Sequence, residues 1–106
     1  MAEKKIDEFT TEEIELASIA KALSHPARIK ILKILNDMNS FICGQIVEQM
    51  PLSQATVSQH LKELKNAGLI KGEIEGPKTC YCINGKQLQH AGAIIEKLFT
   101  KLKNCC

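Results

Sequence analysis

Cysteines at alternating positions of one short stretch carry the most distinctive chemistry in the sequence. Cys80 and Cys82 stand in KTCYCIN, whose pattern is typical of a β-strand, so both side chains are expected on one face. Cys43 precedes this stretch, and Cys105 and Cys106 are the last two residues. Thiolates are soft ligands for As(III), Sb(III), cadmium, lead, copper(I) and zinc, and thiols are also oxidised to disulfides. The spacing therefore indicates either metal-ion binding or redox sensing.

Compartment and geometry argue against structural disulfides. The five cysteines are an odd number, and the charged start of the chain lacks the apolar core of a secretion signal. We therefore expect a cytoplasmic protein without a membrane segment, whose cysteines are thiols, metal ligands or redox sensors. Cα atoms two apart on a strand are separated by about 6.6 Å, near the upper limit for a bridged pair. Neither Cys80 with Cys82 nor the adjacent Cys105 and Cys106 is then an easy disulfide.

Catalytic constellations are missing from the sequence. It has no glycine-rich phosphate loop, no serine, histidine and aspartate set and no clustered carboxylates, so we expect neither an enzyme nor a required cofactor. His25, which precedes a proline, and His60, inside a predicted helix, are expected to be structural, and His90 to be an exposed polar residue.

Length and composition limit the chain to one modest core. With 106 residues, 44% hydrophobic residues and no tryptophan, residues 1–106 are expected to form a single domain that gains stability from a partner subunit. The net charge of +2 is too small to indicate nucleic-acid binding by itself. Such a function has to be argued from the placement of the lysines.

Helix start and stop signals divide the first half of the chain. Thr10 and Glu13 have the spacing of a capping box before apolar residues at helical spacing. Pro26 fits the first turn of a second helix, and Pro51 disfavours helix in the residue before it. The predicted elements are a helix over 11–23, a helix over 26–37, a short extended segment at 40–42 and a short helix over 45–50.

Similar signals divide the second half. Ser53 is a good N-cap and Gly68 a good C′ residue for a helix whose inward face carries Val57, Leu61 and Leu64. Further on, the sequence predicts strands over 69–75 and 79–84, joined by Gly76 and Pro77, and a last amphipathic helix over 86–103.

This order of elements predicts a winged helix-turn-helix: a mainly α fold with a small β-hairpin wing. The helix-turn-helix is expected at 44–67, with its second helix entering the DNA major groove, and the wing at 69–84. In such a fold the segment 41–43 pairs with the last wing strand. Cys43, Cys80 and Cys82 are then expected to be neighbours in space and to form an inducer site, with Cys80 and Cys82 on the less buried face of the sheet. Small apolar cysteines without a function are the alternative.

The outward face of the helix after Ser53 is polar and small. Glutamine pairs with adenine in the major groove, serine and threonine bind bases or phosphates, and lysine binds phosphates. An ordinary solvated helix face is the alternative, which the order of elements disfavours. The predicted DNA-binding residues are Gln54, Thr56, Ser58, Gln59, Lys62, Lys65 and Lys78.

The segments KALSHPARIKILKIL, PLSQATVSQHLKELKNAGLIKGEIEG and YCIN resemble the ArsR/SmtB family of bacterial winged-helix repressors over about residues 16–84. The resemblance implies a homodimer that leaves its pseudo-palindromic operator when an inducer binds. It also implies dimerisation through 11–23 and 86–103. The apolar face of the last helix agrees, since it is larger than so small a core covers, although core packing alone is the alternative. That face comprises Leu88, Ala91, Ile94, Ile95, Leu98 and Leu102.

The sequence departs from the two well-known metal sites of that family. The family's well-known thiolate site resembles a Cys-x-Cys followed by an acidic residue. At that place this chain has Phe41-Ile42-Cys43-Gly44-Gln45 and keeps a single cysteine. His90 and Glu96 of the last helix lack matching partners for the family's interface zinc site.

Three functions remain open from the sequence. The first is a repressor released by As(III), Sb(III) or a soft divalent metal bound to Cys43, Cys80 and Cys82, with Cys105 and Cys106 as additional ligands. The second is a repressor of the same fold that senses oxidants or reactive sulfur through its thiols. The third is a winged-helix protein-interaction module without DNA binding, a reading that the low net charge suggests.

Overall fold

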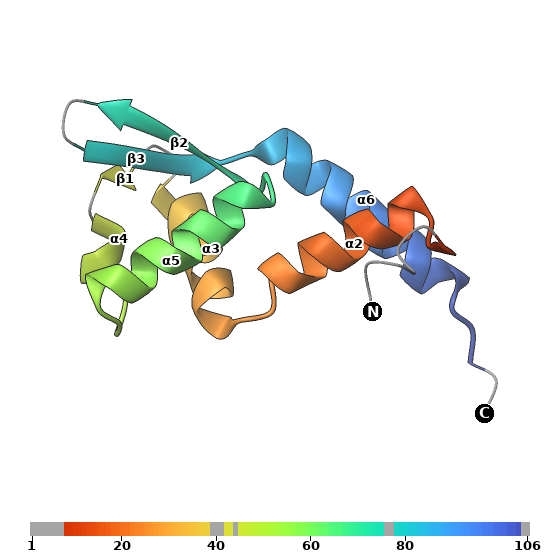
Figure 1. Ribbon diagram of the computed structural model, residues 1–106. Helices are drawn as coiled ribbons and strands as arrows, with labels where there is room; N and C mark the ends of the chain where they lie inside the picture. The colour runs from red at the N-terminus through yellow and green to blue at the C-terminus, as the bar shows by residue number, and fades with distance from the viewer. Residues whose placement is uncertain (1–7, 39–41, 44, 76–77, 105–106) are drawn as a thin grey trace.

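The computed structural model describes residues 8–38, 42–43, 45–75 and 78–104, without the side chains of 42–43, 73–75 and 78–79. Helices and a small sheet follow one another in the predicted order (Figure 1). The elements are α2 (Thr11–Ala22), α3 (Pro26–Met38), β1 (Ile42–Cys43), α4 (Gln45–Glu48), α5 (Gln54–Asn66), β2 (Ile70–Glu75), β3 (Lys78–Ile83) and α6 (Gly85–Lys101). The mainly helical fold with a hairpin wing is therefore confirmed.

Local signals in the sequence fix the ends of the helices. The capping box at α2 is formed, since Thr10 Oγ1 accepts from the Glu13 N–H at 3.0 Å and Glu13 Oε1 accepts from the Thr10 N–H at 2.9 Å. At α3, Pro26 is the first helical residue and His25 Nδ1 accepts from the Ala27 N–H at 3.0 Å. These side chains satisfy amide donors that the first helical turn leaves without a backbone partner.

The turn between α4 and α5 is wider than predicted. Helix α4 ends at Glu48 rather than at Met50, and α5 starts after its N-cap Ser53. The Ser53 side chain accepts from the Thr56 N–H at 3.3 Å. At the other end of α5, Gly68 has φ +80°, a left-handed conformation that explains why glycine stands there.

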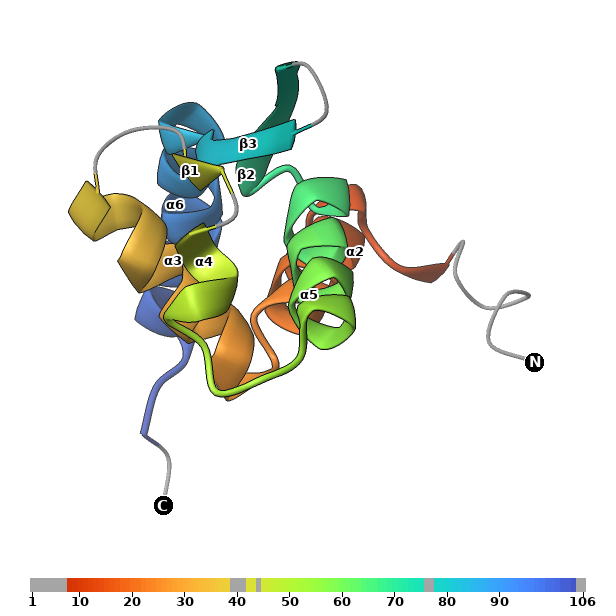
Figure 2. The same ribbon diagram turned by 90° about the vertical axis from the view of Figure 1, so that its left-hand side faces the viewer.

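The sheet has the strand order β1-β3-β2, and both pairs are antiparallel. Ile42 pairs with Tyr81 and Cys43 with Cys80, which confirms that the short strand lies against the last wing strand. The predicted connection at Gly76 and Pro77 lies outside the described residues. Strand β3 is thus central, and Figure 2 shows β1 lying along it near α4.

The connection from the wing to α6 depends on Asn84, which the sequence analysis did not single out as a cap. Its side chain accepts from the Gln87 N–H at 3.4 Å and donates to the Gly68 carbonyl at 2.9 Å. Its backbone N–H donates to the Leu69 carbonyl at 3.0 Å. Asn84 therefore caps α6, starting it at Gly85, and ties it to the end of α5.

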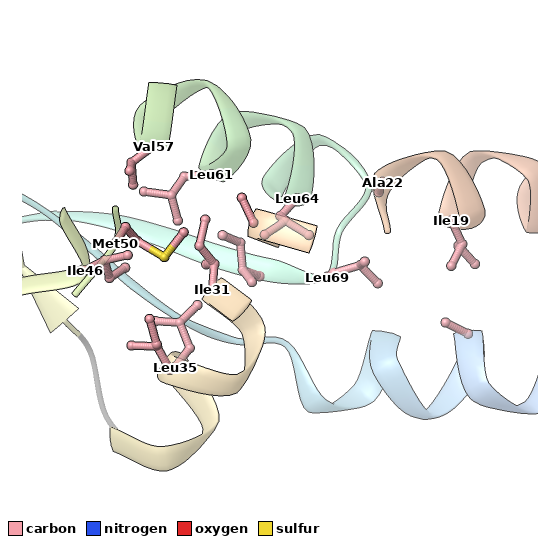
Figure 3. Packing of buried hydrophobic residues seen from close by; sticks show 14 of the residues in the cluster. Ile19, Ala22, Ile31, Leu35, Ile46, Met50, Val57, Leu61, Leu64 and Leu69 are labelled. Atoms are coloured by element: carbon pink, nitrogen blue, oxygen red, sulfur yellow. The ribbon is translucent and has the colours of Figure 1, made fainter. Parts of the chain in front are cut away.

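The main core lies between α3, α4, α5 and the sheet (Figure 3). Ile31 of α3, Val57 and Leu64 of α5 and Leu69 have no exposed surface. Full burial of such a side chain stabilises the fold by about 1.5–3 kcal/mol. Val57 and Leu64 belong to the inward face predicted for α5, so the core fixes which face of that helix meets solvent.

Helices α2 and α6 lie side by side as an arm beside the main core (Figure 1). Ile19 and Ala22 of α2 and Ala91 and Ile94 of α6 are buried there. The chain measures 49 × 31 × 25 Å with a radius of gyration of 16.0 Å. A compact domain of this length has a radius of gyration of about 13 Å, so the molecule is elongated along the arm.

Candidate nucleic-acid interface and cysteine positions

Helix α5 presents an exposed polar face opposite its buried apolar residues. Because Val57, Leu61 and Leu64 pack into the core, the side chains between them point outward. The residues exposed on this helix include Gln54, Ala55, Thr56, Ser58, Gln59, Lys62 and Lys65. The exposure predicted for six of the proposed DNA-binding residues is therefore found, while the side chain of Lys78 lies outside the described part of the chain.

Two side chains of this face are engaged within the helix. Gln59 Nε2 donates to Glu63 Oε2 at 3.2 Å, one turn further on. The Thr56 hydroxyl lies 3.0 Å from the Ser53 hydroxyl at the N-cap. Pairing of Gln59 with a base would therefore replace its contact with Glu63, an exchange that the sequence analysis did not anticipate.

The end of α5 lies against the wing at a glycine. A Cβ placed on Gly72 would come within 3.3 Å of Lys65 Nζ and 3.2 Å of Tyr81 Cε1. Gly72 and Tyr81 are partners across the β2–β3 pair. Because Gly72 has no side chain, Lys65 can lie over the wing. The Lys65 ammonium then places a positive charge where α5 meets the hairpin.

His60 is the one buried polar residue of α5 in the described chain, with 7% exposure. Its Nδ1 accepts from Arg28 Nε at 3.1 Å, and its ring lies 4.4 Å from that of His25. Arg28 Nη1 also donates to the Lys21 carbonyl at 3.0 Å. Both histidines make structural contacts, as predicted, but the arginine that binds His60 was missed. His60 follows Val57 by three residues on the inward face, and a buried imidazole requires a partner.

Burial lowers the pKa of His60 below its usual value, and the positive charges of His25 and Arg28 lower it further. The nearby Glu63 carboxylate raises the pKa of His60. The imidazole is therefore neutral near pH 7, with Nδ1 able to accept the hydrogen bond from Arg28.

Cys43 and Cys80 are direct partners across the β1–β3 pair. Cys80 has no exposed surface and is disulfide-bonded, whereas Cys82 is a half-buried free thiol two residues along the same strand. The sheet thus brings together the backbone positions that the sequence analysis expected to be neighbours. Cys105 and Cys106 lie outside the described residues.

Two expectations for Cys80 were wrong. We predicted that it would lie on the less buried face, but β3 is the central strand and α3 packs against it, so Cys80 is fully shielded. We also expected thiols rather than disulfides. That argument weighed neighbours along one strand, whereas directly opposed residues have Cα atoms about 4.5–5.5 Å apart, inside the range for a bridged pair.

The described side chains offer no ready metal-binding cluster. Among them, no group of three or more His, Cys, Asp or Glu residues is arranged to hold an ion. His90 Nε2 of α6 lies 2.9 Å from Glu15 Oε2 of α2, with side chains 51% and 38% exposed. Lys97 Nζ similarly lies 3.2 Å from Glu12 Oε2. These pairs fasten the two helices of the arm to each other.

Large apolar side chains remain exposed along the arm. Phe99 of α6 is 67% exposed, and Leu102, directly after α6, is 64% exposed. Leu98 of α6 and Ile14 of α2 are exposed as well. The buried Ala91 and Ile94 show that core packing covers only part of the apolar face of α6. Phe99 was not singled out in the sequence.

In the part of the chain that the structure describes, no helix is long and apolar enough to cross a membrane.

Comparisons with known proteins agree with this geometry. The sequence profile described as "Bacterial regulatory protein, arsR family" matches residues 25–71, from the start of α3 into the wing. An uncharacterised HTH-type transcriptional regulator of Methanocaldococcus jannaschii is 33% identical over 82 residues, which cover 77% of this chain and 92% of that protein. The arsenical resistance operon repressor of Staphylococcus xylosus is 31% identical over 91 residues, 86% of each chain.

A solved structure shows the same fold. The ArsR-like transcriptional regulator from Rhodococcus sp. RHA1 superposes with a TM-score of 0.72 at 25% identity. The match covers 87% of this chain and 86% of that one. The structural similarity thus reaches beyond the residues 25–71 that the sequence profile matches.

Proposed function

Since the chain belongs to the ArsR family of DNA-binding transcriptional regulators, which are not enzymes, we propose that it is a homodimeric repressor whose operator binding is controlled by its sheet cysteines. It acts on operator DNA in the cytoplasm. The observation that carries the proposal is the direct opposition of Cys43 and Cys80 on β1 and β3. Strand β1 leads into the helix-turn-helix and β3 belongs to the wing, so chemistry at this pair acts on both parts of the DNA-binding surface.

The exposed face of α5 is the proposed reader of the operator. Gln54 and Gln59 offer amides for adenine, and Thr56 and Ser58 offer hydroxyls for bases or phosphates. Lys62 and Lys65, together with Lys78 in the wing, neutralise phosphates. The buried apolar face opposite holds the helix at a fixed angle to the wing, so these side chains are presented together.

A second copy of this chain is the proposed cover of the arm. The exposed Leu98, Phe99 and Leu102 form the kind of apolar surface that marks an interface, and the elongated monomer leaves it open. Two-fold symmetry then places two copies of α5 on successive major grooves, about 34 Å apart. The operator is therefore expected to be pseudo-palindromic.

The first candidate for the effector is a soft metal or metalloid, As(III) or Sb(III) or a soft divalent ion. In the reduced protein Cys43, Cys80 and Cys82 would supply thiolates, and Cys105 and Cys106 could add to them. The name of the Staphylococcus xylosus relative, an arsenical resistance operon repressor, supports this chemistry. Cys82 shares the strand face of Cys80, which supports its inclusion.

The second candidate is oxidation, and the disulfide-bonded state of Cys80 favours it. Cys43 is the proposed partner because it stands opposite in the strand register. Two thiols would lose two electrons and two protons to hydrogen peroxide, whose O–O bond breaks to give two waters, and one S–S bond would form. The link would join β1 to β3 covalently.

Selection from a random-sequence duplex library tests the DNA-binding part of this proposal. The reduced protein is expected to enrich a pseudo-palindrome with half-sites one helical turn apart. Enrichment of no sequence would contradict operator binding and favour a protein-interaction module. Mass spectrometry after treatment with peroxide or with arsenite separates the two effectors, since disulfide formation removes two hydrogen atoms and arsenite adds arsenic.

A further inference from the structure

We propose that Arg28 and His60 form a positioning pair that sets the angle of the recognition helix α5 relative to the dimerisation helix α2. The inference rests on the proposed function, in which α5 reads the operator. It assigns to two residues outside the predicted DNA-contacting set a role in operator specificity.

Arg28 joins three helices through directed hydrogen bonds. It belongs to α3, its Nε donates to His60 Nδ1 of α5 at 3.1 Å, and its Nη1 donates to the Lys21 carbonyl of α2 at 3.0 Å. A second contact of Nη1 reaches the Ala22 carbonyl at 3.5 Å. The planar guanidinium holds its donors in a fixed fork, so these bonds fix the three helices relative to one another.

The acceptors on α2 are the carbonyls at its C-terminal end. Such carbonyls have no partner within the helix and carry partial negative charge, which suits a guanidinium. The Lys21 carbonyl also accepts from the Ser24 N–H at 3.2 Å and from the Ser24 hydroxyl at 2.6 Å. In a dimer built on α2 and α6, the end of α2 is held by the interface. Through its bonds to α2 and to His60, Arg28 then fixes the middle of α5, between the core residues Val57 and Leu64, relative to that interface.

His60 is suited to be the receiving group because it is 7% exposed and points inward, away from the DNA-facing side of α5. His25 packs on its ring at 4.4 Å, which restricts the orientation of the imidazole. The groups that face it are His25, which precedes α3, Arg28 of α3 and Glu63 of α5. Only the neutral imidazole accepts at Nδ1, so acid is expected to break the bond to Arg28.

Substitutions on both sides of the bond test the pair in the full-length dimer. Arg28→Met removes the guanidinium, and His60→Leu removes the acceptor. His60→Asn keeps an acceptor near the Nδ1 position, and Lys30→Met is a control that removes an exposed charge from the same helix. The measurements are affinity for the selected operator and for a random duplex, each as a function of salt, with circular dichroism to confirm folding.

Arg28→Met and His60→Leu are each expected to lower the ratio of operator to random-duplex affinity by about tenfold, with an unchanged salt slope. The double variant is expected to be no worse than either single variant, because both remove the same bond. His60→Asn and Lys30→Met are expected to keep the ratio. Acid is expected to lower the ratio for the wild type but not for His60→Asn, whose amide does not titrate.

Two results would overturn the inference alone. One is an Arg28→Met variant that loses affinity equally for both duplexes with a salt slope smaller by about one, the signature of a phosphate contact. The other is a folded His60→Leu variant with the wild-type ratio. A wild-type protein that does not distinguish the two duplexes would instead overturn the proposed operator binding, and this inference with it.

Discussion

Cys43 and Cys80 stand directly opposite each other on antiparallel strands that belong to different parts of the DNA-binding unit. Residues so paired have Cα atoms about 4.5–5.5 Å apart, close enough for one bond or one shared ion to join their side chains. Strand β1 is followed by α4, while β3 follows from β2 through the wing. A link at this pair would thus constrain the helix-turn-helix and the wing relative to each other.

Replacement of the sheet cysteines should separate induction from DNA binding. Cys43→Ser and Cys80→Ser are each expected to reduce effector-driven operator release at least about tenfold, because each removes one half of the opposed pair. Operator affinity of the reduced protein should change less than about threefold, since neither residue is in the predicted DNA-contacting set. Fluorescence anisotropy of a labelled operator measures both quantities, and a serine variant that is released like the wild type would speak against the pair.

Gln59 and Lys62 are expected to have different roles on the same exposed face. Gln59→Ala should reduce discrimination at one base pair by about 1–3 kcal/mol, because an amide that reads adenine is lost. Lys62→Ala should weaken operator and random duplex alike and reduce the salt slope by about one. Binding to a panel of single-base operator variants at several salt concentrations distinguishes the two, and identical profiles would contradict these assignments.

Acid should destabilise the fold through His60. Its pKa is lowered in the folded state by burial and by the charges of His25 and Arg28, so the unfolded chain binds a proton more readily. The stability that depends on the neutral imidazole is complete above the unfolded pKa of about 6.5 and is lost as the pH falls towards the lowered folded value.

Urea denaturation at pH 7.5 and 5.5 measures this loss. The wild type should lose more stability between the two pH values than His60→Asn, in which the group cannot titrate. An equal loss in both proteins would assign the acid sensitivity to other groups.

Charge on the arm should prevent dimerisation. Phe99→Glu or Leu102→Glu places a carboxylate on a side chain with more than half its surface exposed in the single chain and, in the proposed dimer, buried. Sedimentation velocity should show a monomer, with operator affinity reduced by more than about tenfold. Thr100→Glu, at an exposed neighbour, is the matched control because it also adds one negative charge. A dimeric Phe99→Glu protein with normal operator affinity would place the interface elsewhere.

Gly68 should tolerate alanine poorly for reasons of backbone conformation alone. Its φ of +80° costs an L-residue about 1–2 kcal/mol, while an added Cβ would meet only the Gln87 side chain, at 3.5 Å or more. Gly68→Ala is therefore expected to lose about 1 kcal/mol of unfolding free energy in urea. Gly85→Ala, with open space around its Cβ, should be neutral or slightly stabilising, and equal effects at both glycines would contradict this account.

Much of the fold could be predicted because the signals are local. The capping box of Thr10 and Glu13, the cap at Ser53 and the glycine at position 68 depend on neighbours in the sequence, and the structure contains all three. The apolar spacing of four and three residues at Val57, Leu61 and Leu64 of α5 also indicated which side chains would be exposed. The end of α4 was misjudged because a single helical turn has few hydrogen bonds of its own.

The site was harder to predict because its decisive contacts join distant residues. Arg28 meets His60 across 32 positions of sequence, and nothing near either residue indicates the other. Cys80 was placed on the right strand and near Cys43, but the direct pairing of the two was not predicted, and the burial of Cys80 depends on the strand order β1-β3-β2 and on α3. Exposed Phe99 was missed because it stands beside the regular apolar spacing of α6 rather than within it.

The most direct test of thiol-controlled repression is a titration under anaerobic conditions. The fully reduced dimer, bound to its selected operator, is titrated with arsenite, cadmium, zinc or copper(I), and in parallel with peroxide, while thiolate absorption and operator release are followed together. The account predicts stoichiometric release by at least one of these reagents, lost in the Cys43→Ser and Cys80→Ser variants. An operator complex that stays intact with every reagent, or release that persists in both variants, would contradict it.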